Sequence, residues 1–157
     1  MPAFDFMGRR TPGNDLNPYA VMVETELRKF GINVEQARLR VENGFGWTFP
    51  HGSATIEVYI GQQENTGRGF LQVLSPIVHL PVENLMSLYR RLLEENLRMS
   101  NAAFGVYLDI VFVFDERPLD GLNPVEIQDI VTLVANYADD MDDQLVREFG
   151  GRLFRRI

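Results

Sequence analysis

The segment from Pro76 to Ile130 indicates the fold of this chain: PIVHLPVENLMSLYRRLLEENLRMSNAAFGVYLDIVFVFDERPLDGLNPVEIQDI. It reads as the end of a strand, a helix that begins at 80–83, an apolar run from Ala103 to Phe114, and a helix that begins at Pro124. The order of these elements predicts an architecture, and the segment contains no pattern typical of a reaction centre.

The helix that begins at Pro124 has a complete start signal. Asn123 stands at the N-cap, Pro124 at the first helical position, and Glu126 at the third, where its side chain can reach back to the cap. Apolar residues then recur at three- and four-residue spacing, which places them on one helix face: Ile127, Ile130, Val131, Val134, Ala138, Met141 and Leu145. We therefore expect a helix to about Phe149, ended by Gly150 and Gly151.

Two further proline signals predict helices earlier in the chain. Residues 16–18 open a helix that Gly31 ends, and residues 80–83 open one that runs to about Asn101. This second helix is apolar over an arc too wide for one sheet face, and a helix that is apolar on two sides needs a second surface to cover it. The side chains that widen its arc are Met86, Leu93 and Leu97.

Strands are predicted between the helices. Residues 44–49 and 55–60 read as strands, and a third runs over 70–78, where Ser75-Pro76 predicts that the far end is an edge or a bulge. The run from Ala103 to Phe114 is either one long bent strand or a hairpin that turns near Leu108-Asp109, and we favour the hairpin. The order helix, three strands, helix, two strands, helix predicts an α+β fold with an antiparallel sheet.

This arrangement resembles the YbjN-like proteins, which are grouped by fold with the class I type III secretion chaperones. The resemblance covers roughly residues 19–146 and rests on the strands of Trp47 and 56–60 and on LSPIV at 74–78, LLEEN at 92–96, AFG at 103–105 and RPLDGL at 117–122. One departure is that the chain between Phe104 and Val111 lacks the glycine-rich turn usual there.

The resemblance implies an α-β-β-β-α-β-β-α sandwich whose helices pack against one antiparallel sheet. It also implies a homodimer, with an apolar surface that in the secretion chaperones receives an extended segment of a client protein. No catalytic residues belong to the family pattern, so the resemblance implies none here.

The size and composition predict a single domain. The chain has 157 residues, 45% of them hydrophobic, which is enough for one core and too short for two ordinary domains. We expect a flexible N-terminal arm over 1–16, one domain over 17–149, and a basic and apolar C-terminal tail over 150–157. No apolar run approaches the ~20 residues that span a bilayer, and there is no cysteine, so we expect a cytoplasmic protein without membrane contact.

The charge distribution argues against a nucleic-acid partner. The net charge is −7, and residues 101–149 carry only Arg117 and Arg147 against eleven acidic side chains. A surface of this sign repels a phosphate backbone, whose binding depends on neutralisation by Lys and Arg.

Two groups of residues have the chemistry of a reactive site. The four carboxylates of 139–143 are suitable ligands for a hard cation, but on a helix they lack the turn of a calcium loop, and we favour a solvated helix face. His51 and His79 are the only histidines, and no motif surrounds either, so turn and surface roles are favoured over a general base. We therefore predict no catalytic residue, no metal and no cofactor.

The candidates for partner binding are therefore apolar and aromatic. Strand aromatics either line a groove for a peptide or fill the core, the interpretation we favour; the tail is either a docking peptide or a frayed terminus. The candidate residues are Trp47, Tyr59, Phe70, Met86, Leu93, Leu97, Leu153 and Phe154. We predict a non-enzymatic protein- or peptide-binding module, chaperone- or adaptor-like and homodimeric, with a small-ligand-sensing regulator that has an enclosed pocket as the alternative.

Overall fold

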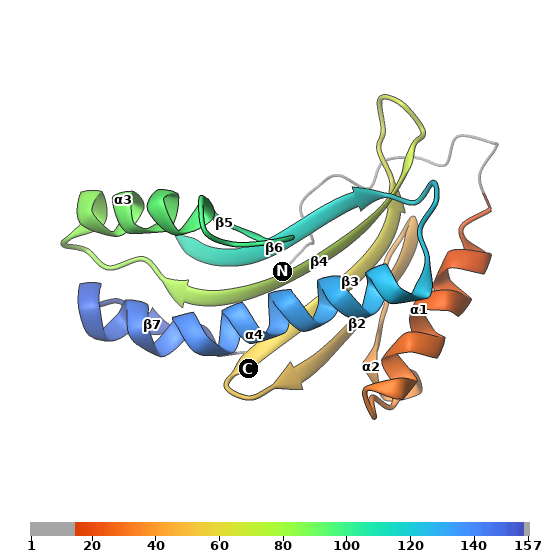
Figure 1. The fold of residues 1–157 in the computed structure, drawn as a ribbon, viewed down its shortest axis with the longest axis horizontal. Coiled ribbons are helices and arrows are strands. Elements are labelled where there is room, and N and C mark those ends of the chain that lie inside the picture. The colour runs from red at the N-terminus through yellow and green to blue at the C-terminus, as the bar shows by residue number, and fades with distance from the viewer. Residues whose placement is uncertain (1–14, 156–157) are drawn as a thin grey trace. The chain divides into compact units, whose positions relative to one another are not determined.

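Residues 15–155 are described by a computed structural model, whose fold is shown in Figure 1. The helices are α1 (Asn17–Lys29), α2 (Val34–Ala37), α3 (Leu85–Asn96) and α4 (Pro124–Phe149). The strands are β1 (Arg38–Leu39), β2 (Gly44–His51), β3 (Ala54–Gln62), β4 (Gly69–His79), β5 (Ala103–Tyr107), β6 (Ile110–Pro118) and β7 (Arg152–Leu153). The predicted arm lies outside the described residues, except for Asp15 and Leu16.

The strands of this part of the chain form one seven-stranded sheet. Its order is β1-β2-β3-β4-β6-β5, and β7 pairs separately with β4. The prediction of an α+β fold with one antiparallel sheet is confirmed. Three short elements, α2, β1 and β7, are additions that the sequence patterns did not predict.

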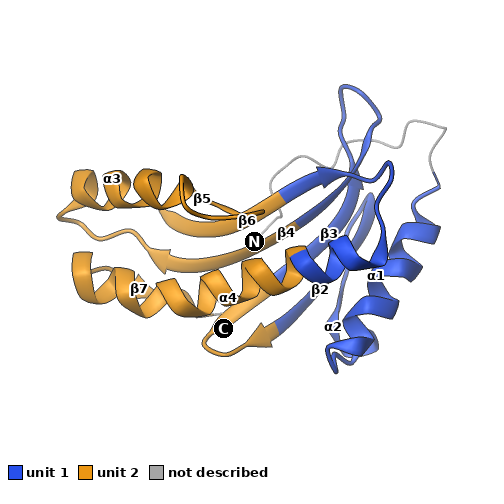
Figure 2. Cartoon of the chain, viewed as in Figure 1, with its two compact units in different colours: residues 1–49, 57–72, 116–129 blue, residues 50–56, 73–115, 130–157 orange. Residues whose placement is uncertain are grey.

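The chain divides into two compact units, which Figure 2 shows in different colours. Unit 1 contains the described residues up to 49 together with 57–72 and 116–129, and unit 2 contains 50–56, 73–115 and 130–157. Strands β2, β3, β4 and β6 and helix α4 contribute residues to both. Leu27 and Trp47 are buried in the core of unit 1, and Leu74, Leu88 and Phe112 in that of unit 2.

The start of α4 confirms the predicted capping box. The Asn123 side-chain oxygen accepts a hydrogen bond from the Glu126 backbone N–H at 3.1 Å, and the Glu126 carboxylate accepts one from the Asn123 backbone N–H at 3.1 Å. The Arg117 guanidinium forms an ion pair with the same carboxylate. Local signals are sufficient here because every partner except Arg117 lies within one turn.

The prediction that residues 80–83 open a helix is wrong. Helix α3 begins at Leu85, after Asn84 in the left-handed region at φ 65°. Pro81 is buried, and the Asn84 side-chain amide donates to the carbonyl oxygen of Phe149 at 3.4 Å. The segment before α3 is therefore held against the end of α4, a contact between residues far apart in the sequence that proline and cap patterns cannot show.

The two uncertain strand regions are now resolved. Strand β4 continues through Pro76 to His79, and its far end pairs with β7, so the prediction of an edge there is wrong, and the alternative of a bulge stays a prediction. The favoured hairpin is confirmed: β5 and β6 pair in antiparallel register from Ala103–Phe114 to Tyr107–Ile110. Leu108 and Asp109 form its two-residue turn with φ values of 46° and 61°, a geometry that usually takes Asn-Gly.

Candidate interaction surface

Helix α3 exposes a stripe of large apolar side chains in unit 2. Met86, Leu93 and Leu97 are 80%, 68% and 89% exposed, and they recur at spacings of seven and four residues on one side of the helix. The opposite side carries Leu88 and Leu92, which are buried. The helix therefore packs with one side, and its other side has no apolar partner among residues 15–155, as the width of its apolar arc indicates.

Specific contacts hold α3 in place. The Asn96 side chain both accepts from the Phe104 backbone N–H at 2.7 Å and donates to the Phe104 carbonyl oxygen at 3.2 Å, which ties the end of α3 to β5. Arg91 bridges Glu95, at 2.9 Å on the same helix, and Glu148 on α4, at 3.0 Å. The exposed stripe is thus presented by a fixed helix, and not by a loosely attached segment.

Strand β5 adds a backbone edge to the same part of unit 2. It is the last strand in the sheet order, so one of its edges carries no further strand among the described residues. Val106 on β5 is 42% exposed, and Leu108 in the following turn is 66% exposed. Helix α3 packs against β5, as Figure 1 also shows, so we consider the stripe and the strand edge together and call them the α3–β5 surface.

Sequence patterns missed three members of this exposed apolar group. Val82, Val106 and Leu108 are 96%, 42% and 66% exposed. The sequence could have indicated that Leu108 is exposed, because a branched apolar residue stands where the hairpin turn normally takes Asn or Gly. No sequence feature predicts the exposure of Val82 or Val106, since an apolar residue near a helix start or in a strand is ordinarily part of a core.

The aromatic candidates of unit 1 lie elsewhere. Trp47 and Tyr59 are only 1% and 4% exposed, and Phe70 is half-buried. The Trp47 indole N–H donates to the Glu24 carboxylate at 3.1 Å, and the Tyr59 hydroxyl donates to Glu57 at 2.8 Å. Their polar atoms are thus satisfied inside the unit, which is the usual arrangement for buried Trp and Tyr. A partner-binding role for them stays a prediction.

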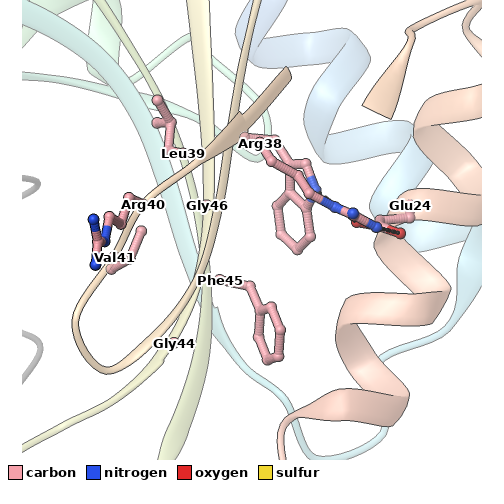
Figure 3. A pocket seen from close by; sticks show the side chains of 9 residues that line it. Glu24, Arg38, Leu39, Arg40, Val41, Gly44, Phe45 and Gly46 are labelled. Carbon is pink, nitrogen blue, oxygen red and sulfur yellow. Dashed lines mark hydrogen bonds and ion pairs between the residues drawn. The ribbon is translucent and has the colours of Figure 1, made fainter. Parts of the chain in front are cut away.

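An open pocket lies beside Trp47, between α1 and the segment that carries β1 and β2 (Figure 3). Arg38 extends to Glu24 with two hydrogen bonds of 2.8 and 3.0 Å, and these bonds lower the pKa of the Glu24 carboxyl against the opposing effect of burial. The Phe45 ring stacks on Trp47 with centroids 6.3 Å apart. The volume is about 190 Å³, below the ~300–1,000 Å³ typical of small-molecule sites.

The acidic cluster on α4 is not a fully solvated face, so that interpretation is wrong for part of it. Asp142 is 3% exposed and accepts a hydrogen bond from the Ser53 hydroxyl at 2.6 Å. Asp139 accepts from the Ser53 backbone N–H at 2.7 Å, and this bond lowers the pKa of Asp139. Burial raises the pKa of Asp142. These two carboxylates secure the β2–β3 turn, which sequence spacing could not predict.

The described residues contain no group of three or more His, Cys, Asp or Glu side chains arranged to hold a metal ion. Within the same residues no helix is both long enough and apolar enough to cross a membrane. His51 is exposed at the end of β2, next to the β2–β3 turn. His79 is half-buried at the end of β4, and burial, followed by the nearby Arg152, lowers its pKa.

The tail candidates Leu153 and Phe154 lie beside the end of β4. Leu153 belongs to β7, and the Phe154 ring stacks on His79 with centroids 5.5 Å apart. Both side chains are half-buried. The structure thus brings the α3 candidates together with β5, and Leu153 and Phe154 together with β4, all within unit 2.

Comparison with known proteins agrees with the resemblance seen in the sequence. A search of curated proteins found no match. A family model described as "T3SS (YopN, CesT) and YbjN peptide-binding chaperone 1" matches residues 21–157. Because this match extends over most of the sequence, and the fold has the expected α+β order, the chain belongs to the TY-Chap1 family of T3SS and YbjN peptide-binding chaperones.

Proposed function

We propose that this protein is a non-enzymatic, cytoplasmic chaperone or adaptor that acts as a homodimer and binds an extended segment of a client protein. Family membership supports the peptide-binding role. The observation that carries the proposal is the α3–β5 surface, where an uncovered apolar stripe lies beside the edge strand of the sheet.

The α3 stripe is suited to a second copy of the chain. Two identical stripes can pair about a twofold axis, because each surface is then its own complement. Complete burial of a Leu or Met side chain contributes about 2 kcal/mol, so with the observed exposures the three side chains contribute on the order of 4–5 kcal/mol per copy. Both copies together contribute about 8–10 kcal/mol. This lies within the ~4–15 kcal/mol cost of association, which favours a dimer that dissociates on dilution.

The edge of β5 is suited to the client. An extended segment that adds to a sheet edge gains main-chain hydrogen bonds whatever its sequence, and side-chain pockets then provide specificity. The exposed Val106 offers an apolar contact along this edge. A client held in this way would remain extended, as a segment protected before secretion or assembly needs to be.

The dimer is tested by sedimentation equilibrium of wild type and Leu97→Asp. Leu97 is the most exposed residue of the stripe. Because both copies lose its burial and gain a charge, we expect the dissociation constant of the dimer to rise at least about a hundredfold. Ser87→Asp is the matched control, since it adds the same charge about 100° from Met86 around the helix. Equal weakening by both variants would contradict a dimer on this stripe.

The client site is tested by a photo-crosslinking amino acid at Val106, compared with the same amino acid at Val125. Both valines are exposed, but Val125 lies in unit 1 at the start of α4. We expect one recurrent client segment at Val106 and none at Val125. Crosslinks of the same proteins at both positions would indicate nonspecific adhesion and refute the β5 site.

A further inference from the structure

The end of β4 already holds an added strand, formed by the C-terminal segment of the same chain. Val78 pairs with Leu153 and His79 with Arg152 in antiparallel register. The Phe154 backbone N–H donates to the Ile77 carbonyl oxygen at 2.8 Å. The segment from Arg152 to Phe154 therefore uses main-chain pairing, the same mode by which sheets bind extended peptides.

The end of β4 can pair with this strand because β4 extends past the neighbouring strand β3. The Ser75 hydroxyl donates to the Thr55 carbonyl oxygen at 2.7 Å, so the first residues of β3 lie beside Ser75. β3 begins at Ala54, whereas β4 continues to His79. The last residues of β4 thus extend past β3, and β7 covers their otherwise unpaired backbone groups.

Two glycines direct the chain onto this edge. Gly150 and Gly151 have φ values of 87° and 86°, which L side chains rarely adopt. A Cβ on Gly151 would collide with the His79 carbonyl oxygen, whereas a Cβ on Gly150 would stand 3.7 Å from Pro81, an ordinary contact. The close approach of the tail to β4 therefore requires glycine at 151 for steric reasons and at 150 only for its backbone angle.

Few interactions besides the main chain hold the tail in place. Leu153 and Phe154 are only half-buried, and Arg152 and Arg155 are exposed. Within residues 15–155 no ion pair joins either arginine to an acidic side chain. Among the described residues, the segment makes one aromatic ring contact, between His79 and Phe154. Main-chain pairing tolerates other sequences, so a different segment with a similar pattern fits the same edge.

We propose that the end of β4, Ile77–His79, is a second strand-addition site, and that the chain's own C-terminal strand closes it until a partner segment replaces that strand. The partner segment is extended and carries the pattern of the tail, in which a branched apolar residue and an aromatic residue stand between arginines. The proposal rests on the proposed function only in assuming such a client, and its site is separate from the α3–β5 surface.

Tethering makes the tail an effective competitor. A short flexible linker holds a segment near its site at an effective concentration in the millimolar range. A free segment of equal intrinsic affinity therefore has to overcome this local concentration, which lowers its apparent affinity by about a hundredfold or more. Release of the tail is then the step that opens the site.

The test measures binding of a fluorescein-labelled peptide with the sequence of residues 150–155 to the full-length chain by fluorescence anisotropy. Gly151→Val displaces the tail by its collision with His79, and Phe154→Glu removes the ring contact. We expect both variants to bind the peptide at least about tenfold more tightly than wild type. Leu97→Asp, which tests the α3 stripe, should bind it as weakly as wild type, so the two proposals fail independently.

A reversible disulfide between the tail and β4 provides a control within one molecule. Residues 77 and 154 share a hydrogen bond, so 78 and 153 form the adjacent non-hydrogen-bonded pair, with Cα atoms typically ~4.5 Å apart and within disulfide range. The chain has no cysteine, so Val78→Cys/Leu153→Cys forms a single disulfide. The oxidised form should not bind the peptide, and reduction should restore weak binding. Binding by the oxidised form, or no gain in either opening variant, would overturn the proposal.

Discussion

Asp142→Asn should stabilise this protein at neutral pH, although it alters a buried hydrogen-bonded residue. The Ser53 hydroxyl lies 2.6 Å from Asp142 Oδ2 and 2.9 Å from Asp139 Oδ1. A hydroxyl has one proton and can donate to only one of these oxygens. With both carboxylates charged, one close oxygen pair therefore lacks a proton.

An asparagine fits the same two partners, the Ser53 hydroxyl and the Asp143 backbone N–H, without this conflict. Its side-chain oxygen accepts from the Asp143 backbone N–H, which lies 2.6 Å from Asp142 Oδ1, and its amide donates to the Ser53 oxygen. The Ser53 hydroxyl is then free to donate to Asp139. The substitution adds one satisfied hydrogen bond, for which we expect about 1 kcal/mol at pH 7, and removes a buried charge.

The stability gain from Asp142→Asn should depend on pH. Because burial raises the pKa of Asp142, the folded chain binds a proton there more tightly than the unfolded chain does. The unfavourable contribution of Asp142 to wild-type stability is therefore largest at neutral pH and disappears as the pH falls toward the ordinary value of 3.8. The advantage of Asp142→Asn should shrink over the same window.

Urea unfolding at pH 7 and pH 4.5, followed by the fluorescence of the single tryptophan, measures the effect. Asp140→Asn is the matched control, since Asp140 is an exposed neighbour on α4 and its substitution removes the same negative charge. An equal gain from both variants would mean that general charge repulsion is the cause. A loss of stability at pH 7 from Asp142→Asn would refute the hydrogen-bond reasoning.

Three further predictions follow from local geometry. Leu108→Asn/Asp109→Gly should raise the free energy of unfolding by about 1–2 kcal/mol, because both turn residues have positive φ; no gain in urea unfolding would show that the turn is unstrained. Asn123→Ala should lower it by about 1 kcal/mol through loss of the α4 cap, and a thermal melt unchanged within error would contradict this. Arg152→Gln should raise the pKa of His79 by removing a nearby positive charge, as an NMR titration of the imidazole proton would show; an unchanged titration would mean that burial alone sets the pKa.

Sequence patterns predicted those features whose partners lie close together along the chain. The α4 cap involves Asn123 and Glu126, three residues apart, and the sequence predicts the β5–β6 turn at Leu108-Asp109 despite its unusual residues. The wide apolar arc of α3 likewise follows from periodicity alone, and it led to the exposed residues Met86, Leu93 and Leu97.

The failures concern contacts between distant segments. Helix α3 begins late because Asn84 binds the end of α4, Asp142 is buried because it holds Ser53 of the β2–β3 turn, and β4 is covered at its end by residues 152–154. No local pattern carries this information, since each contact depends on how the folded chain brings two remote segments together.

Hydrophobic periodicity and capping thus suffice for the element order, the fold class and one candidate surface, because they act over a few residues. Which apolar residues stay exposed, which carboxylates become buried and where the C-terminal strand lies follow only from packing. Burial is a property of the whole fold, in which each side chain competes for a limited interior, and Leu92 and Leu93 illustrate this: neighbours in sequence with the same side chain, one is 4% exposed and the other 68%.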